Sequence, residues 1–120
     1  MIASSEVLCR VSLSIEVSSG RSPHTRILRV AGPVTLQNFT QLQSEFLREA
    51  IPLTILDLSG VPQMDSAGLG AILKYYVAAQ KRGHKLVLTG VQGRVLDLLK
   101  LTRVDSLIPL AATVEQAETL

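Results

Sequence analysis

One segment constrains the fold of this chain more than any other, the stretch from Leu53 to Gly70. Residues 53–58 form an apolar run that suits a strand covered on both faces. The Gly-Val-Pro sequence at 60–62 ends that strand, and helical spacing of apolar residues begins at Leu69. The segment therefore predicts a buried strand, a loop and a helix start, with Ser66 at or beside the helix N-terminus.

Two interpretations of Ser66 are open at this point. Unpaired backbone N–H groups and the helix dipole favour a negative charge such as a phosphate at a helix N-terminus, whereas Asp and Ser are also ordinary N-cap residues. Neither Asp65 nor Ser66 has Glu or Gln three residues later, so no capping box forms. Gly68 and Gly70 each cost the helix about 1 kcal/mol relative to alanine, and glycines beside an exposed serine allow another backbone to come close. This pattern favours the docking of another molecule over the turn that carries Ser66.

The first half of the chain predicts a hairpin followed by a helix. Apolar residues alternate with polar ones from Val7 to Val17, which is typical of a half-buried strand. An extended pattern resumes over 26–31 after a turn-rich loop, so the two strands are expected to pair. Helical spacing of apolar residues from Leu36 to Ala50 predicts a helix, with Thr35 as its N-cap.

The second half continues the alternation of helices and strands. After Ser66 the helix is expected to bury Leu69, Ile72, Leu73, Tyr76 and Ala79 and to end at 81–83. A strand at 85–89, a short helix around 95–99 and a brief strand near 107–108 follow. The Thr-x-x-Gln pattern at 113–116 has the form of a capping box, so a last helix is expected to run toward Leu120.

The order of elements is therefore β-β-α-β-α-β-α-β-α, which predicts an α/β fold. An antiparallel N-terminal hairpin followed by βα units gives a mixed sheet with helices packed on it and right-handed crossovers. Ser66 is expected just past the carboxyl end of a central strand, where open α/β sheets usually place their sites. With 120 residues and 47% hydrophobic composition, residues 1–120 are expected to form a single domain.

The same segment carries a resemblance to a known family. Leu-Asp-Leu-Ser-Gly-Val at 56–61 and Met-Asp-Ser-Ala-Gly-Leu-Gly at 64–70 resemble the signature of STAS domains, specifically of bacterial anti-sigma factor antagonists. The similarity continues through Gly90 and residues 95–102 and covers nearly the whole chain. In that family the serine of the Asp-Ser motif is phosphorylated by a kinase that is itself the anti-sigma factor. The resemblance places that role on Ser66.

The resemblance also implies partners and a binding surface. The expected partners are an anti-sigma factor serine kinase of the histidine-kinase-like ATPase type, which would itself bind ATP, and a serine phosphatase that resets the switch. The residues expected to contact a partner are Thr35, Asp57, Asp65, Ser66, Ala67, Gly68, Leu69 and Gly70. Thr35 stands where many members carry an acidic residue that helps engage the kinase, and Arg103 stands where a glycine is common.

Composition narrows the class of protein. A single cysteine, Cys9, forms no internal disulfide, residues 1–6 lack the features of a signal peptide, and no stretch approaches the ~20 apolar residues of a membrane span. A soluble cytoplasmic protein is expected. The net charge is only +2 and aromatic residues make up 3%, so the interleaved basic and aromatic surface of many nucleic-acid binders is absent from the sequence.

Catalysis is disfavoured by the same residues. A nucleophile elbow needs glycine two positions before the serine, where this chain has Met64, and no acidic residue lies between Ser66 and His84. One cysteine and two separated histidines give no metal-ligand spacing, and the nucleotide-binding glycine motifs are incomplete, so no cofactor is expected. The chain is predicted to be a kinase substrate rather than an enzyme. An unphosphorylated STAS scaffold in a signalling or lipid-transport assembly is the alternative, and a serine hydrolase a weaker third.

Overall fold

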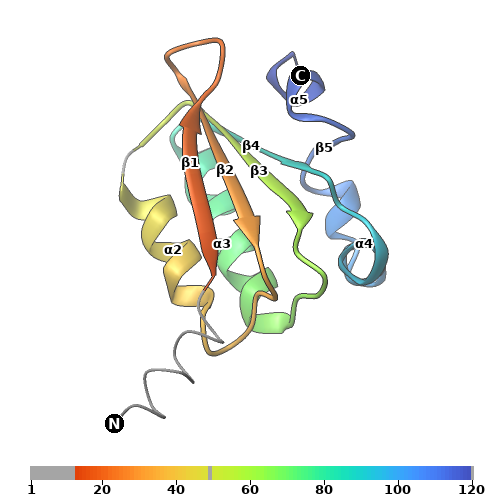
Figure 1. Cartoon of the computed structure of the whole chain (residues 1–120). Coiled ribbons are helices and arrows are strands. Elements are labelled where there is room, and N and C mark those ends of the chain that lie inside the picture. Colours follow the sequence, from red (N-terminus) through yellow and green to blue (C-terminus); the bar gives the residue numbers. More distant parts are fainter. Residues whose placement is uncertain (1–12, 49, 120) are drawn as a thin grey trace, which may run out of the picture.

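A five-stranded sheet forms the centre of the computed structural model, which describes residues 13–48 and 50–119. The strands lie in the order β1-β2-β3-β4-β5 (Figure 1). Their bounds are Ser14–Ser19 for β1, Thr25–Ala31 for β2, Leu53–Gly60 for β3, Lys85–Thr89 for β4 and Leu110–Ala111 for β5. The pair β1 and β2 is antiparallel and the other pairs are parallel. The predicted mixed sheet with an N-terminal hairpin is thus confirmed.

Helices cover both faces of this sheet. Their bounds are Phe39–Arg48 for α2, Ser66–Lys81 for α3, Gly93–Leu101 for α4 and Val114–Glu118 for α5, with a short 3-10 helix, η1, at Val104–Ser106. Helices α2 and α3 lie side by side on one face (Figure 1), whereas α5 packs on the other face against β3, β4 and β5. The order of helices and strands agrees with the one predicted from the sequence.

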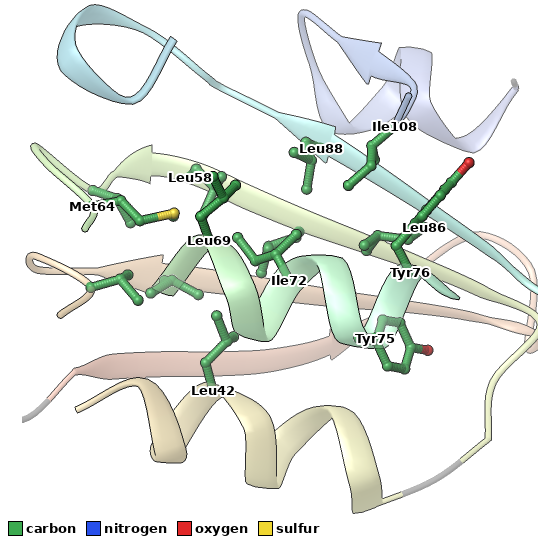
Figure 2. Close-up of a cluster of buried hydrophobic side chains, with 14 of the residues drawn as sticks. Leu42, Leu58, Met64, Leu69, Ile72, Tyr75, Tyr76, Leu86, Leu88 and Ile108 are labelled. Atoms are coloured by element: carbon green, nitrogen blue, oxygen red, sulfur yellow. The ribbon is translucent and has the colours of Figure 1, made fainter. Parts of the chain in front are cut away.

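The alternation of side chains along the strands divides the core into two layers. Leu28, Leu56 and Leu88 belong to the larger layer, beneath α2, α3 and α4, and Figure 2 shows this layer from the side of α3. Their strand neighbours Ile27, Ile55 and Val87 form the smaller layer with Ala117 of α5. Ile55 and Leu56 are both fully buried, which confirms that β3 is covered on both faces.

Two predicted features near the N-terminus differ from the structure. The part of the predicted Val7–Val17 strand before residue 13 lies outside the described residues, and β1 begins at Ser14. Val17 is 49% exposed and lines an open hollow at the end of the edge strand, together with Glu45 and Arg48 of α2. The helix predicted from Leu36 begins only at Phe39, after a turn in which the Thr35 carbonyl accepts from the N–H groups of Asn38 and Phe39 and the Thr35 N–H donates to Asn38 Oδ1.

Two predicted features near the C-terminus also differ. The strand expected near 107–108 is wrong, since Ile108 packs singly into the core and pairing with β4 begins only after Pro109, at β5. The hydroxyl of Thr113 accepts the predicted hydrogen bond from the Gln116 backbone N–H, at 3.2 Å. The reciprocal half of the capping box is not made, because the Gln116 side chain accepts from Ala112 instead.

Candidate functional site

The Asp-Ser pair lies where the central strand gives way to α3, and its two residues have different tasks. Asp65 has an extended backbone and is the N-cap, with its carboxylate Oδ1 accepting from the N–H groups of Ala67 at 3.0 Å and Gly68 at 3.1 Å. Ser66 is the first residue of the helix, and it is exposed. Within residues 13–48 and 50–119 its hydroxyl makes no hydrogen bond, so Ser66 is not the helix cap.

Asp65 also fastens the helix start to the loop before α2. Its second carboxylate oxygen, Oδ2, accepts from the N–H of Leu36 at 2.9 Å, and its own N–H donates to the carbonyl of Val34 at 3.0 Å. A parallel bridge joins Val34 to Met64 beside these bonds. The loop that carries Thr35 is therefore held against the turn that carries Ser66.

The two glycines of the turn play opposite parts. A Cβ atom on Gly68 would lie 2.6 Å from Val34 Cγ1 and 3.0 Å from the Val34 carbonyl oxygen, so this glycine is needed for contact within the chain itself. A Cβ atom on Gly70 would have no neighbour within 4 Å, and Gly70 is exposed. The sequence interpretation that both glycines make room for a partner is therefore corrected for Gly68.

The residues expected to contact a partner divide into three groups. Ser66 and Gly70 are exposed, and Thr35, Asp65 and Ala67 are partly exposed beside them. Gly68 and Leu69 are buried. The side chain of Leu69 lies in the core at 6% exposure and is not accessible to a partner. We refer below to Thr35, Leu36, Ser66, Ala67 and Gly70 as the Ser66 surface.

Asp57 does not join this group. It alternates with Leu56 and Leu58 along β3, so it points to the sheet face that carries α5, away from the layer under α3. There its carboxylate forms an ion pair with Arg29 at 3.7 Å and accepts from the Ser59 N–H at 3.0 Å. Asp57 shapes the loop at the end of β3 and is placed on the opposite face from Ser66.

Two features of the site had no clear signal in the sequence. Leu36 was expected inside a helix with its side chain toward the core, and it is 70% exposed on the turn next to Asp65. The side chain of Gln63 accepts from Arg94 Nη1 at 3.1 Å, which connects the loop before Ser66 to the first turn of α4. The periodicity of the sequence could not predict the exposure of Leu36 or the hydrogen bond of Gln63, because both depend on which loops the sheet brings together.

Neither His24 nor His84, both within the described residues, lies where it could activate Ser66 as a nucleophile. His84 follows the far end of α3, whose 16 residues begin with Ser66 and span about 24 Å. His24 precedes β2, and its carbonyl accepts from Leu53 at the start of β3, at the opposite end of that strand from Ser66. What the site can do chemically is present an unpartnered hydroxyl to another protein.

A metal site and a membrane-spanning helix are both absent from the part of the chain that the structure describes. Within it, no three or more His, Cys, Asp or Glu side chains are grouped so that they could hold a metal ion. None of the helices found there has the length and apolar character that crossing a bilayer requires.

The fold and the site together define a small α/β domain that presents an exposed serine at a helix start, beside the carboxyl end of the central strand. A family model described as STAS domain matches residues 16–117, and the chain belongs to this family. The recognition of a STAS domain from the sequence is therefore confirmed.

Similar proteins include regulators of sigma factors. The anti-sigma-B factor antagonist of Listeria monocytogenes is 29% identical over 102 residues, which cover 82% of this chain and 88% of the relative. The solved structure of an anti-sigma factor antagonist from Mycobacterium paratuberculosis has a TM-score of 0.78 at 20% identity, covering 89% of this chain and 92% of the other. The Bacillus protein SpoIIAA has a TM-score of 0.69 at 14% identity in both its unphosphorylated and phosphorylated forms, with 88% of this chain covered and 94% and 97% of the two SpoIIAA chains.

Proposed function

We propose that this protein is a phosphorylation-switched anti-sigma factor antagonist. It binds an anti-sigma factor kinase while Ser66 is unmodified, releases it when Ser66 is phosphorylated, and so regulates sigma-factor-dependent transcription. The observation that carries this proposal is the exposed Ser66 hydroxyl, which is free of hydrogen bonds among the described residues and lies at the first position of α3. The name of the Listeria relative supports the general role.

The switch in this proposal is electrostatic. A phosphoserine carries about −1.5 to −2 charges at neutral pH, and the carboxylate of Asp65 lies one residue before it. Near a protein surface two unit charges 4 Å apart interact by roughly 4 kcal/mol, and each 1.4 kcal/mol corresponds to about tenfold in affinity. A partner that packs closely on the uncharged serine is therefore released when charge accumulates there.

The fold itself can accept the modification. A negative group at a helix N-terminus is favoured by the helix dipole, and Asp65 already accepts from the Ala67 and Gly68 N–H groups, so the phosphate can stay directed toward solvent. The equal similarity of this chain to both forms of SpoIIAA is consistent with a fold that the phosphate leaves intact. In the proposal, binding changes while the domain keeps its structure.

The remaining partners follow from this role. The kinase binds ATP and transfers its γ-phosphoryl group to the Ser66 hydroxyl, leaving ADP, and a serine phosphatase restores the unmodified serine. The protein itself is a substrate and binding module without catalysis of its own. The distance between Ser66 and His84 agrees with this assignment, since no histidine base reaches the hydroxyl.

The test uses the kinase-type anti-sigma factors encoded in the same genome, each purified and incubated with the protein and ATP. Intact-mass measurement is expected to show one added phosphate on the wild type and none on Ser66→Ala. In binding measurements without ATP, Ser66→Ala is expected to keep the affinity and Ser66→Asp to lose about tenfold or more. Equal affinity of the two variants would contradict the switch.

A second function has one observation in its favour. Thr35 replaces the acidic residue with which many antagonists engage the kinase, and it lies partly exposed beside Asp65. The alternative is an unphosphorylated scaffold that binds a signalling or lipid-transport assembly. Stable partner binding with no phosphate on Ser66 after incubation with every kinase would select this alternative.

A further inference from the structure

We infer that Leu36 is the apolar residue through which the Ser66 surface binds its partner, the anti-sigma factor kinase of the proposed function. Asp65 holds this apolar anchor in place beside Ser66. This inference rests on the proposed function and adds to it a residue that strengthens the binding. It also gives a reason why a phosphate on the neighbouring serine is incompatible with binding.

Exposure alone does not distinguish Leu36. Its side chain is 70% exposed, but Leu47 on α2 and Leu101 at the end of α4 are exposed at 76% and 84%. Single exposed leucines are normal on protein surfaces and need no explanation. What separates Leu36 from the others is its place beside Ser66, because its backbone N–H donates to the carboxylate of Asp65.

The loop around Leu36 is fixed by hydrogen bonds from residues on both sides of it. The Thr35 N–H donates to Asn38 Oδ1 at 2.8 Å, and Asn38 Nδ2 donates to the carbonyl of Pro33 at 2.8 Å. Asn38 is only 3% exposed, so its side-chain amide is buried and its hydrogen bonds stabilise the turn. The Leu36 N–H itself donates to Asp65 Oδ2 at 2.9 Å.

The result is an apolar side chain held out into solvent on a rigid support. The exposed leucine leaves apolar surface in water, which is unfavourable unless a partner covers it. The hydrogen bonds around Leu36 order its backbone before binding, as the helices do for Leu47 and Leu101, so little further backbone entropy is lost when a partner binds it.

The position of the anchor defines the partner that fits it. The Leu36 backbone lies one hydrogen bond from Asp65, the residue before Ser66, and open space surrounds Gly70 one helical turn further on. A partner that encloses Leu36 in an apolar pocket therefore also covers the Ser66 hydroxyl with its rim. Covering a phosphate there would strip water from a doubly charged group, which is strongly unfavourable without a cationic partner.

The experiment compares substitutions of two equally exposed leucines. Leu36→Ala, Leu36→Met and the matched control Leu47→Ala are titrated, without ATP, against the kinase-type anti-sigma factor of the same genome that binds the wild type. We expect Leu36→Ala to weaken binding by about 10- to 100-fold, as for a hot-spot residue. Leu36→Met, which keeps an apolar side chain of similar volume, and Leu47→Ala are expected to stay within about threefold.

The outcomes separate this inference from the proposed function. If Leu36→Ala binds as tightly as the wild type while Ser66→Asp does not bind, the anchor is overturned and the switch stands. If Ser66→Asp and wild type bind equally, the proposed function fails, and the inference that rests on it fails as well. Far-ultraviolet circular dichroism and urea unfolding of Leu36→Ala check that the variant is folded, which is expected because the side chain makes no core contact.

Discussion

At the scale of single residues, the neighbours Asp65 and Ser66 differ in their hydrogen bonds. Asp65 accepts three backbone hydrogen bonds, from Leu36, Ala67 and Gly68, while Ser66 makes none with its hydroxyl among the described residues. The serine is therefore available for modification without loss of a helix cap. A similar difference separates Gly68, which the chain needs for its own packing, from Gly70, which it does not.

The two glycines give a paired prediction. Gly68→Ala is expected to destabilise the protein by about 1–3 kcal/mol, because the new methyl group collides with Val34. Gly70→Ala is expected to stabilise it by about 0.5–1 kcal/mol, because alanine is the better helix former and has free space there. Urea unfolding of both variants measures the difference, and changes of the same sign would contradict the assignment of Gly68 to internal packing.

At the scale of elements, the end of the sheet opposite Ser66 is fixed by a buried polar cluster. The Tyr75 hydroxyl of α3 lies 3.0 Å from the Thr54 hydroxyl of β3, and Arg26 of β2 donates to both. The ring of Tyr75 also stacks on Phe46 of α2, with 4.3 Å between the ring centroids. One side chain thus connects two strands and two helices.

Removing only the hydroxyl tests this cluster. Tyr75→Phe keeps the stacked ring and is expected to cost about 1–2 kcal/mol of unfolding free energy, because buried hydrogen bonds to Arg26 and Thr54 are lost. Urea unfolding of Tyr75→Phe, Thr54→Val and the double variant gives the coupling energy between the two hydroxyls. Strictly additive effects would show that the 3.0 Å contact contributes nothing of its own.

The elements also show where sequence reasoning succeeds and where it stops. Strand β3 and helix α3 were predictable because burial on both faces and regular apolar spacing leave direct patterns. The late start of α2 was not, since it depends on Asn38 and Asp65 accepting hydrogen bonds across the loop. The position of β5 was missed because Ile108 is as apolar as a strand residue but fills the core from an irregular segment.

The same distinction applies to the site. The exposed Ser66 at a helix start could be predicted from the residues around it, because glycines, Asp and a following apolar repeat mark that position. The placement of Asp57 on the other face and the exposure of Leu36 could not, because each depends on how strands and loops meet in three dimensions.

At the scale of the whole molecule, the site lies at one edge of a fold whose two core layers it does not enter. Ser66 is exposed, and Leu69 is the first residue of α3 whose side chain belongs to the large layer. A change of charge at Ser66 is therefore separated from the packing that stabilises the domain.

We expect Ser66→Asp to change the free energy of unfolding by no more than about 0.5 kcal/mol, as is usual for an exposed position without contacts. Repulsion from Asp65 and attraction to the helix dipole act in opposite directions there. Urea unfolding at low and high salt checks both the size of the change and its screening. A loss above about 2 kcal/mol, well outside that range, would show that the site and the core are coupled.

Because Asp65 alone caps α3, position 66 is also a suitable attachment point for synthetic chemistry. A cysteine introduced there, once Cys9 has been replaced, would accept thiol-reactive groups of chosen size and charge on an unaltered scaffold. Under the proposed function, a photocleavable label at that point would let an investigator control partner binding with light.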